Sequence, residues 1–144
     1  MKPLLLKPIG DKTIWGNNRM SKLRGYNENI GTWWEVSAHF YCSNEIINLD
    51  TNITLQQLID QNPHDILGPD YTLHEMLRLA YLDSQDALSI QVHPDDDYAK
   101  KHDNDFGKYE SWYIIDALPN ASLVAGTNIS NQEIIKKALK NGTL

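Results

Sequence analysis

The sequence predicts a mainly β domain, or an α+β domain, with a few short helices attached. Several short apolar runs rich in β-branched and aromatic residues are bounded by Gly, Pro, Asn and Asp, a pattern typical of strands. The helical patterns are few and short, and each begins with a capping residue. The sequence has no regular alternation of strands with helices and no glycine-rich phosphate loop after a strand, which argues against a nucleotide-binding α/β fold.

The composition is that of one soluble globular domain. The chain has 144 residues, of which 41% are hydrophobic and 22% charged, enough for one compact core. The net charge of −6 argues against nucleic acid or an anionic membrane surface as a partner, although a phosphorylated small molecule needs only a few local cations. The single cysteine, Cys42, excludes an intramolecular disulfide and fits a reducing compartment. The apolar run Leu4–Leu6 is too short for a signal peptide or a membrane span, so we expect a cytoplasmic protein.

The predicted strands follow the alternation of apolar and polar residues. In chain order they cover residues 3–9, 33–38, 45–49, 88–93, 108–116 and 121–126. Residues 71–83 fit either a helix, with its apolar residues at helical spacing, or a strand, with Leu77, Leu79 and Tyr81 alternating. We favour a strand over the second half of this segment. Residues 19–30 are polar and predict a loop.

Three helices are predicted from their caps. Thr54 can cap a helix over residues 55–61, which Pro63 would end. Asp95 is the expected N-cap of a helix over residues 95–103, where acidic residues suit the positive end of the helix dipole. The pattern Ser130-Asn131-Gln132-Glu133 matches a capping box and predicts a helix over residues 131–140, with Gly142 just past its end.

Two of the predicted strands carry an unusually polar face. Successive side chains of a strand point to opposite faces, so Ser89, Gln91 and His93 share one face while Leu88, Ile90 and Val92 share the other. Lys108, Glu110 and Trp112 likewise share a face of the second strand. Together the two polar faces offer an imidazole, an amide, a carboxylate, an ammonium and a hydroxyl. That set suits a divalent metal beside an anionic substrate.

These two segments resemble the signature motifs of type I mannose-6-phosphate isomerases (phosphomannose isomerases). The similar segments are Leu88-Ser89-Ile90-Gln91-Val92-His93-Pro94-Asp95-Asp96 and Gly107-Lys108-Tyr109-Glu110-Ser111-Trp112-Tyr113-Ile114-Ile115, with further matches at Lys7-Pro8-Ile9, Ile14-Trp15-Gly16, Asn29-Ile30-Gly31 and Trp34-Glu35-Val36-Ser37-Ala38-His39. The order and spacing hold from the N-terminus to about residue 126. The resemblance implies a cupin-like (jelly-roll) fold, incomplete in this chain, with residues 1–144 as the N-terminal portion of the catalytic domain.

The resemblance also implies a zinc-dependent enzyme that interconverts mannose 6-phosphate and fructose 6-phosphate. By position, Gln91, His93 and Glu110 match metal ligands of the family, so Zn²⁺ is the expected cofactor. Ser89 and Lys108 match residues assigned to substrate binding. Zinc beside the sugar oxygens would stabilise the enediol through which a proton moves between C1 and C2. The sequence does not assign the general base.

Two departures from the family pattern affect the predicted site. The family has a further metal-binding histidine in a later strand, and this chain ends at Leu144. The chain is therefore expected to be the N-terminal part of a longer isomerase, or a degenerate short protein. The family usually has a phosphate-facing lysine at the position of Ala80, and Arg78, two residues before it and on the same strand face, could replace it.

Less specific interpretations remain open. His93 could be an ordinary strand-end histidine, and Glu110 could simply pair with Lys108 on the same face. The alternative function is a non-catalytic cupin module that binds metal or a sugar phosphate without turnover. A cupin oxygenase is less favoured, because iron oxygenases prefer two histidines and one carboxylate. A half-barrel would expose unpaired strand edges, so self-association is also expected to be possible.

Overall fold

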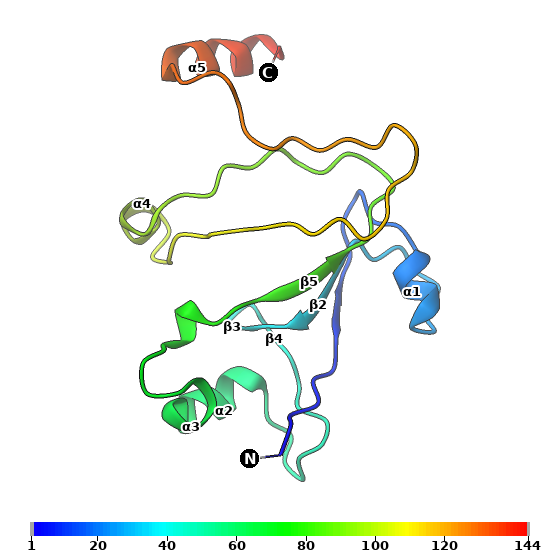
Figure 1. Cartoon of the computed structure of the whole chain (residues 1–144), viewed down its shortest axis with the longest axis vertical. Helices are drawn as coiled ribbons and strands as arrows, with labels where there is room; N and C mark the ends of the chain where they lie inside the picture. Colours follow the sequence, from blue (N-terminus) through cyan, green and yellow to red (C-terminus); the bar gives the residue numbers. More distant parts are fainter. Residues whose placement is uncertain (1, 144) are drawn as a thin grey trace. The chain divides into compact units, whose positions relative to one another are not determined.

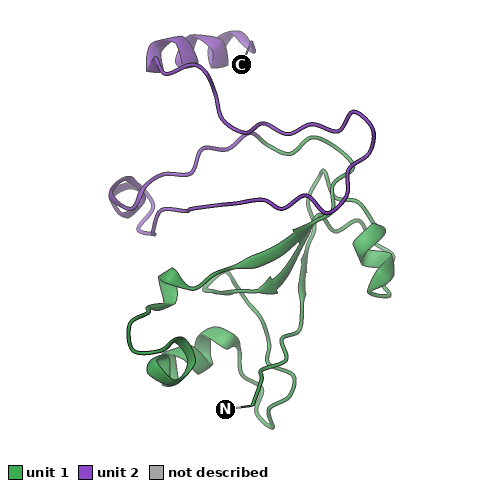
Figure 2. Ribbon diagram, viewed as in Figure 1, with its two compact units in different colours: residues 1–89 green, residues 90–144 purple. Residues whose placement is uncertain are grey.

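The computed structural model describes residues 2–143 and divides into two compact units, Met1–Ser89 and Ile90–Leu144 (Figure 2). The described part of the first unit contains five strands, three α-helices and one 3₁₀ helix, which are labelled in part in Figure 1. In chain order they are β1 (Ile9–Asp11), α1 (Arg19–Leu23), β2 (Thr32–Val36), β3 (Ala38–His39), β4 (Cys42–Ser43), α2 (Leu55–Gln61), α3 (Pro63–Leu67), η1 (Leu73–Glu75) and β5 (Leu79–Leu82). The described part of the second unit contains α4 (Asp96–His102) and α5 (Gln132–Asn141).

A three-stranded antiparallel sheet, in the order β1-β2-β5, forms the centre of the first unit (Figure 1). Trp33 of β2 lies opposite Gly10 of β1 and Tyr81 of β5. Gly10 lets the strands meet here, because a Cβ atom at this position would lie 2.9 Å from Cδ1 of Ile30 and 3.2 Å from the ring of Trp33. The register between β2 and β5 shifts between Trp34 and Val36, as it does at a β-bulge.

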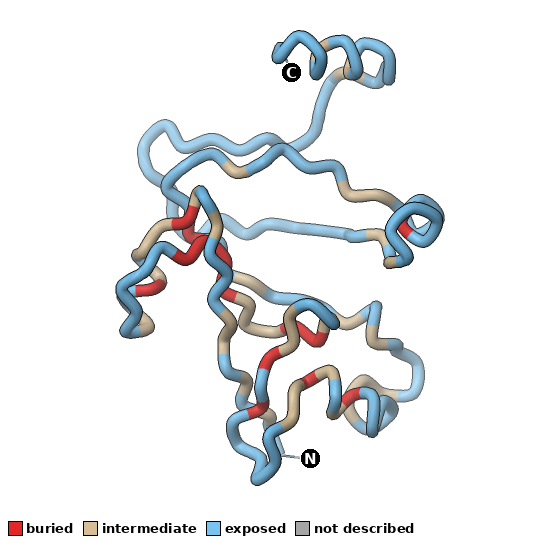
Figure 3. The backbone as a smooth tube through the Cα atoms, turned by 180° about the vertical axis from the view of Figure 1, so that it is seen from behind, coloured by how far each residue is buried: buried red, intermediate tan, exposed pale blue. Residues whose placement is uncertain are grey.

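The hydrophobic core of the first unit lies where α2 meets β3. Ala38, Leu55 and Ile59 are buried there, with partly buried apolar residues such as Leu6 and Val36 packed around them. Figure 3 shows that the buried residues gather in this unit, whereas most of the second unit is exposed. The unit that carries the sheet is therefore the unit with a packed interior.

Asn44 holds the segments around this core together. Its side chain is fully buried. The amide nitrogen donates hydrogen bonds to the carbonyl oxygens of Lys7 and Trp34, both at 2.9 Å, and the amide oxygen accepts one from the Ser37 backbone at 2.6 Å. These bonds join three separate backbone segments to one side chain and satisfy its buried polar atoms, which would otherwise lose their hydration without replacement.

The predicted helices are confirmed, with local corrections. Thr54 forms a complete capping box with Gln57 at the start of α2, and Asp95 caps α4 by accepting from the Tyr98 N–H at 2.9 Å. Pro63 does not simply end α2, because it also begins α3 as its first residue, where proline needs no N–H donor. The cap of α5 is Asn131 rather than Ser130, since its side-chain oxygen accepts from the backbone of Glu133 and Ile134.

Helix α1 lies in the stretch predicted as a loop. The buried carboxylate of Asp83 accepts hydrogen bonds from the Met20 N–H at 2.8 Å and from Arg19 Nε at 3.2 Å. The helix start is thus held by a residue far along the chain, so no local sequence signal marks it.

The strand predictions are confirmed only in the first unit. Residues 33–38 correspond to β2 and β3, and the second half of 71–83 corresponds to β5. Residues 3–9 contribute one isolated bridge, at Leu6, and the first residue of β1, Ile9. Residues 45–49 contribute isolated bridges at Glu45 and Ile46.

Residues 88–93, 108–116 and 121–126 form no strand within the described chain, and in these segments the prediction is wrong. A strand needs a ladder of backbone hydrogen bonds to a neighbour, and residues 2–143 supply none to these segments. The described structure is thus mixed helix and strand with antiparallel sheets.

Candidate functional site

A tight connection in the second unit brings the two polar segments together. After His93, Pro94 leads into α4, and the chain then turns back through Gly107. The Lys108 N–H donates to the Pro94 carbonyl at 3.3 Å, and the Gly107 N–H donates to Asp96 Oδ1 at 2.9 Å. A Cβ atom on Gly107 would lie 2.7 Å from that same Pro94 oxygen. Glycine is therefore required for the close approach that places the segment after α4 against the segment before it.

His93, Lys108 and Glu110 meet at one carboxylate oxygen. His93 Nε2 lies 3.0 Å from Glu110 Oε2, and Lys108 Nζ lies 2.5 Å from the same atom. The indole N–H of Trp112 donates to the other oxygen, Oε1. The side chains of His93 and Glu110 are each 28% exposed. The carboxylate is thus held on both oxygens while the cluster stays open to solvent.

This environment keeps Glu110 ionised. The pKa of Glu110 is lowered from its ordinary value to about 2, and the hydrogen bond from Lys108 is the largest cause. The hydrogen bond from Trp112 and the charges of Lys108 and His93 act in the same direction, whereas desolvation opposes them. A carboxylate must be deprotonated to bind a metal ion, and Glu110 meets that condition across the physiological range.

The donor set of the cluster fits a divalent metal. Zinc takes imidazole nitrogen and carboxylate oxygen, usually from three protein ligands with one open position. His93 and Glu110 supply these two donor types within hydrogen-bond distance of one another. Residues 2–143 contain no group of three His, Cys, Asp or Glu side chains placed for a metal, so a third ligand from this region must be of another type. Gln91, two residues before His93 in the same segment, is a residue of that kind.

Arg78, the predicted phosphate contact, lies in a pocket of the first unit. The pocket has a volume of about 430 Å³, within the range of small-molecule sites. It is lined by Ile9, Gly10, Asp11, Trp34, Ser37, His39, Tyr41, Cys42 and Arg78. Trp34 pairs with Ala80 across β2 and β5, and Arg78, two residues before Ala80, opens to the same pocket. Arg78 lies just before β5, which begins at Leu79, so the shared strand face of Arg78 and Ala80 stays a prediction.

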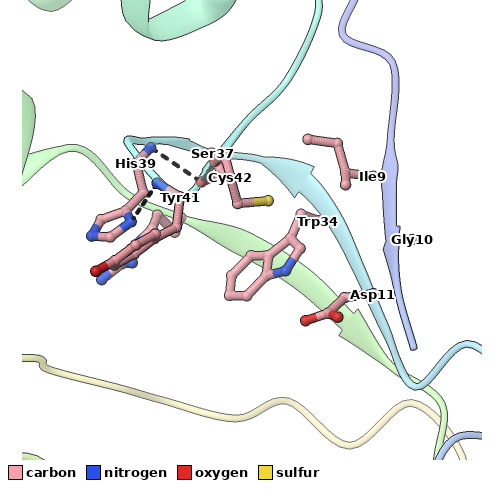
Figure 4. A pocket seen from close by; sticks show the side chains of 9 residues that line it. Ile9, Gly10, Asp11, Trp34, Ser37, His39, Tyr41 and Cys42 are labelled. Carbon is pink, nitrogen blue, oxygen red and sulfur yellow. Dashed lines mark hydrogen bonds between the residues drawn. The ribbon is translucent and has the colours of Figure 1, made fainter. Parts of the chain in front are cut away.

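The hairpin of β3 and β4 shapes one wall of this pocket. The Ser37 hydroxyl donates to the Cys42 carbonyl at 2.5 Å. It also accepts from the His39 N–H at 3.3 Å, and the Tyr41 N–H donates to His39 Nδ1 at 3.4 Å (Figure 4). Burial is the main cause that raises the pKa of the Cys42 thiol. Cys42 is therefore a neutral part of the wall at physiological pH and not an activated nucleophile.

The structure thus brings three of the predicted site residues together. His93, Lys108 and Glu110 form one cluster. Ser89 is the last residue of the first unit, and Gln91 follows shortly after it in the second. Trp112 also bonds directly to Glu110. The sequence signal for this contact was the shared strand face of the two residues.

Among residues 2–143, no helix combines the length and the apolar character needed to span a bilayer.

Comparison with known proteins identifies relatives along nearly the whole chain. No family model matches it. It is 38% identical to a probable mannose-6-phosphate isomerase, GmuF, of Bacillus subtilis, over 97% of this chain and 46% of that protein. It is 32% identical to a mannose-6-phosphate isomerase of Streptococcus mutans, over 98% of this chain and 46% of that protein.

A solved structure also matches nearly the whole of this chain. The crystal structure of the mannose 6-phosphate isomerase from Bacillus subtilis matches 99% of this chain and 46% of its own, with a TM-score of 0.84 and 29% sequence identity. The chain thus spans a little under half the length of the relatives that it matches. This chain is a relative of the mannose-6-phosphate isomerases, and it corresponds to the N-terminal part of those enzymes.

Proposed function

We propose that this chain forms the metal-binding part of a zinc-dependent isomerase that interconverts mannose 6-phosphate and fructose 6-phosphate through an enediol. The observation that supports this most strongly is the cluster of His93, Lys108 and Glu110. It lies within the two sequence motifs that resemble the family, and the relatives carry the names of such isomerases. The proposal includes a cupin fold for the complete domain.

His93 and Glu110 are the proposed metal ligands, with Gln91 as the third. An ion held there would supply positive charge beside the oxygens of the open-chain sugar, where it favours proton transfer between C1 and C2. The Glu110 carboxylate is already ionised and is oriented by Trp112, so it can bind a cation without first losing a proton. Pre-organisation of this kind lowers the cost of binding.

Lys108, Ser89 and Arg78 are the proposed substrate contacts. The ammonium of Lys108 is fixed beside the ligand carboxylate, a position from which it can donate to a sugar oxygen. Arg78 lines a pocket that Asp11 also lines. A guanidinium suits a phosphate dianion, because it can donate two parallel hydrogen bonds. Ser89 would add a hydroxyl donor.

The test is a chimera that places these residues in a chain of full family length. Residues 1–144 replace the matching part of the Bacillus subtilis GmuF relative, and fructose 6-phosphate formation is followed by a coupled assay. We expect turnover that is lost on chelation, restored by zinc and abolished by Glu110→Gln. Glu45→Gln is the matched control, because Glu45 makes a similar exposed pair with Lys7 at 2.9 Å. A folded chimera without turnover, or one whose turnover is unchanged by Glu110→Gln, would contradict the proposal.

A further inference from the structure

Oε2 of Glu110 lies beside two nitrogen atoms of the candidate site. It is 2.5 Å from Nζ of Lys108 and 3.0 Å from Nε2 of His93. The other oxygen of the same carboxylate, Oε1, accepts a hydrogen bond from the indole N–H of Trp112. An ammonium and an imidazole therefore share one carboxylate oxygen, while the indole holds the other.

A metal ion held by His93 and Glu110 would need the oxygen that Lys108 contacts. Oε2 is the oxygen that lies 3.0 Å from the imidazole nitrogen, whereas Oε1 is turned to Trp112. A ligand oxygen gives a lone pair to the ion, and a divalent cation repels an ammonium group placed only 2.5 Å from that oxygen. Lys108 and the ion therefore exclude one another at Oε2.

The Lys108 side chain can leave this oxygen without disturbing the backbone. The N–H of Lys108 donates to the Pro94 carbonyl at 3.3 Å, which fixes the main chain of this residue. The side chain is 39% exposed, and an ammonium on a four-carbon stem reorients easily. Trp112 holds Oε1 independently of Lys108. Departure of the ammonium therefore costs no more than the loss of one partly exposed ion pair.

We infer that Lys108 competes with the metal ion for Oε2 of Glu110, and that binding of the ion releases the Lys108 ammonium to an oxygen of the sugar phosphate. The inference rests on the proposed function, which supplies the ion and the sugar phosphate. Lys108 then couples the two binding events, because a sugar phosphate that holds the ammonium away from Glu110 also removes the competitor of the ion. Such coupling is reciprocal, so each of the two ligands tightens the binding of the other by the same factor.

A lysine that only orients Glu110 would act in the opposite direction. Loss of an orienting partner weakens metal binding, as the loss of groups that hold metal ligands in place commonly does. Loss of a competitor strengthens metal binding. The sign of the change in zinc affinity on removal of Lys108 therefore separates the two roles.

The test compares the zinc affinity of the chimera with that of its Lys108→Met variant, by competition with a fluorescent chelator at one fixed pH, with and without mannose 6-phosphate. We expect Lys108→Met to bind zinc about fivefold more tightly, the factor that corresponds to one partly exposed ion pair. Lys108→Ala should do the same. In the parent, mannose 6-phosphate should tighten zinc binding by about fivefold or more. This effect should shrink in both variants, because the competitor is already gone.

Lys100→Met is the matched control. It removes an ammonium that pairs with Asp96 within α4 at 3.8 Å, and its zinc affinity should equal that of the parent. Equal or weaker zinc binding in Lys108→Met would overturn the inference, as would an effect of mannose 6-phosphate that is as large in the variant as in the parent. A parent that binds no zinc would overturn the proposed function and this inference with it. The two failures are distinguishable, because only the second leaves the parent without metal.

Discussion

Nε2 of His93 lies 3.0 Å from Oε2 of Glu110, although α4 and a turn separate the two residues in the sequence. The contact depends on Gly107, which lets the returning chain approach Pro94. Local chain geometry within the second unit therefore assembles the imidazole and carboxylate pair. The packed core around α2 belongs to the first unit and supplies none of these contacts.

Lys108→Met should raise the pKa of Glu110 from about 2 toward the ordinary value for glutamate, because Lys108 is its largest stabilising partner. The measurement is a carbon-13 NMR titration of the carboxyl group in the metal-free chain. A glutamate whose pKa is lower in the folded state stabilises the fold above the unfolded pKa, and this contribution disappears as the pH falls through the folded pKa. The acid sensitivity of stability between about pH 4.5 and 2 should therefore shrink in the variant.

Lys100→Met is the control for that titration. Lys100 pairs with Asp96 within α4 at 3.8 Å, so its loss removes a nearby positive charge without touching Glu110. A pKa of Glu110 that stays near 2 in Lys108→Met would show that the Lys108 ammonium is not the main cause of the low pKa.

Arg78→Met should raise the KM of the chimera for mannose 6-phosphate by roughly tenfold or more, because a hydrogen bond to a charged group contributes about 1.5–3 kcal/mol. Zinc content should not change, and Arg78→Lys should recover part of the loss because it keeps the charge but not the two-pronged geometry. Steady-state kinetics with mannose 6-phosphate measure the effect. Lys22→Met, which removes a charge from α1, is the control. An unchanged KM in Arg78→Met would exclude Arg78 as a phosphate contact.

Asn44→Ala should destabilise the chain by about 2–4 kcal/mol, because it leaves buried backbone groups without hydrogen-bond partners. The affected groups are the carbonyls of Lys7 and Trp34 and the N–H of Ser37. Urea unfolding followed by circular dichroism measures the change. Asn52→Ala, at an exposed position, should alter stability by less than about 0.5 kcal/mol. Equal stabilities for the two variants would contradict the role assigned to Asn44.

Features set by local chemistry were predictable from the sequence. Thr54 and Asp95 cap their helices through groups only three residues away. Lys108 and Trp112, at alternate positions on either side of Glu110 in the sequence, both contact its carboxylate. Gln91, His93 and Glu110 were expected to converge on one metal ion, and the structure shows the contact of His93 with Glu110. Their binding of metal remains a prediction.

Features that depend on distant partners could not be predicted. Helix α1 begins where the Asp83 carboxylate, supplied from beyond β5, meets its backbone. The pocket around Arg78 is lined by residues of β1, β2 and the β3–β4 hairpin. No local sequence pattern indicates which of these segments come together. The strands predicted for residues 108–116 and 121–126 failed for the same reason, because an alternating pattern specifies a face but not a hydrogen-bonding neighbour.

The most direct test of the account is the zinc content of the chimera after dialysis against metal-free buffer, measured by atomic spectrometry in the parent, His93→Ala, Glu110→Gln and Glu45→Gln proteins. The account predicts about one zinc ion per chain in the parent and in Glu45→Gln, and near-complete loss in both site variants. A folded parent that retains no zinc, or site variants that retain as much as the parent, would contradict the assignment of His93 and Glu110 as ligands of one metal ion.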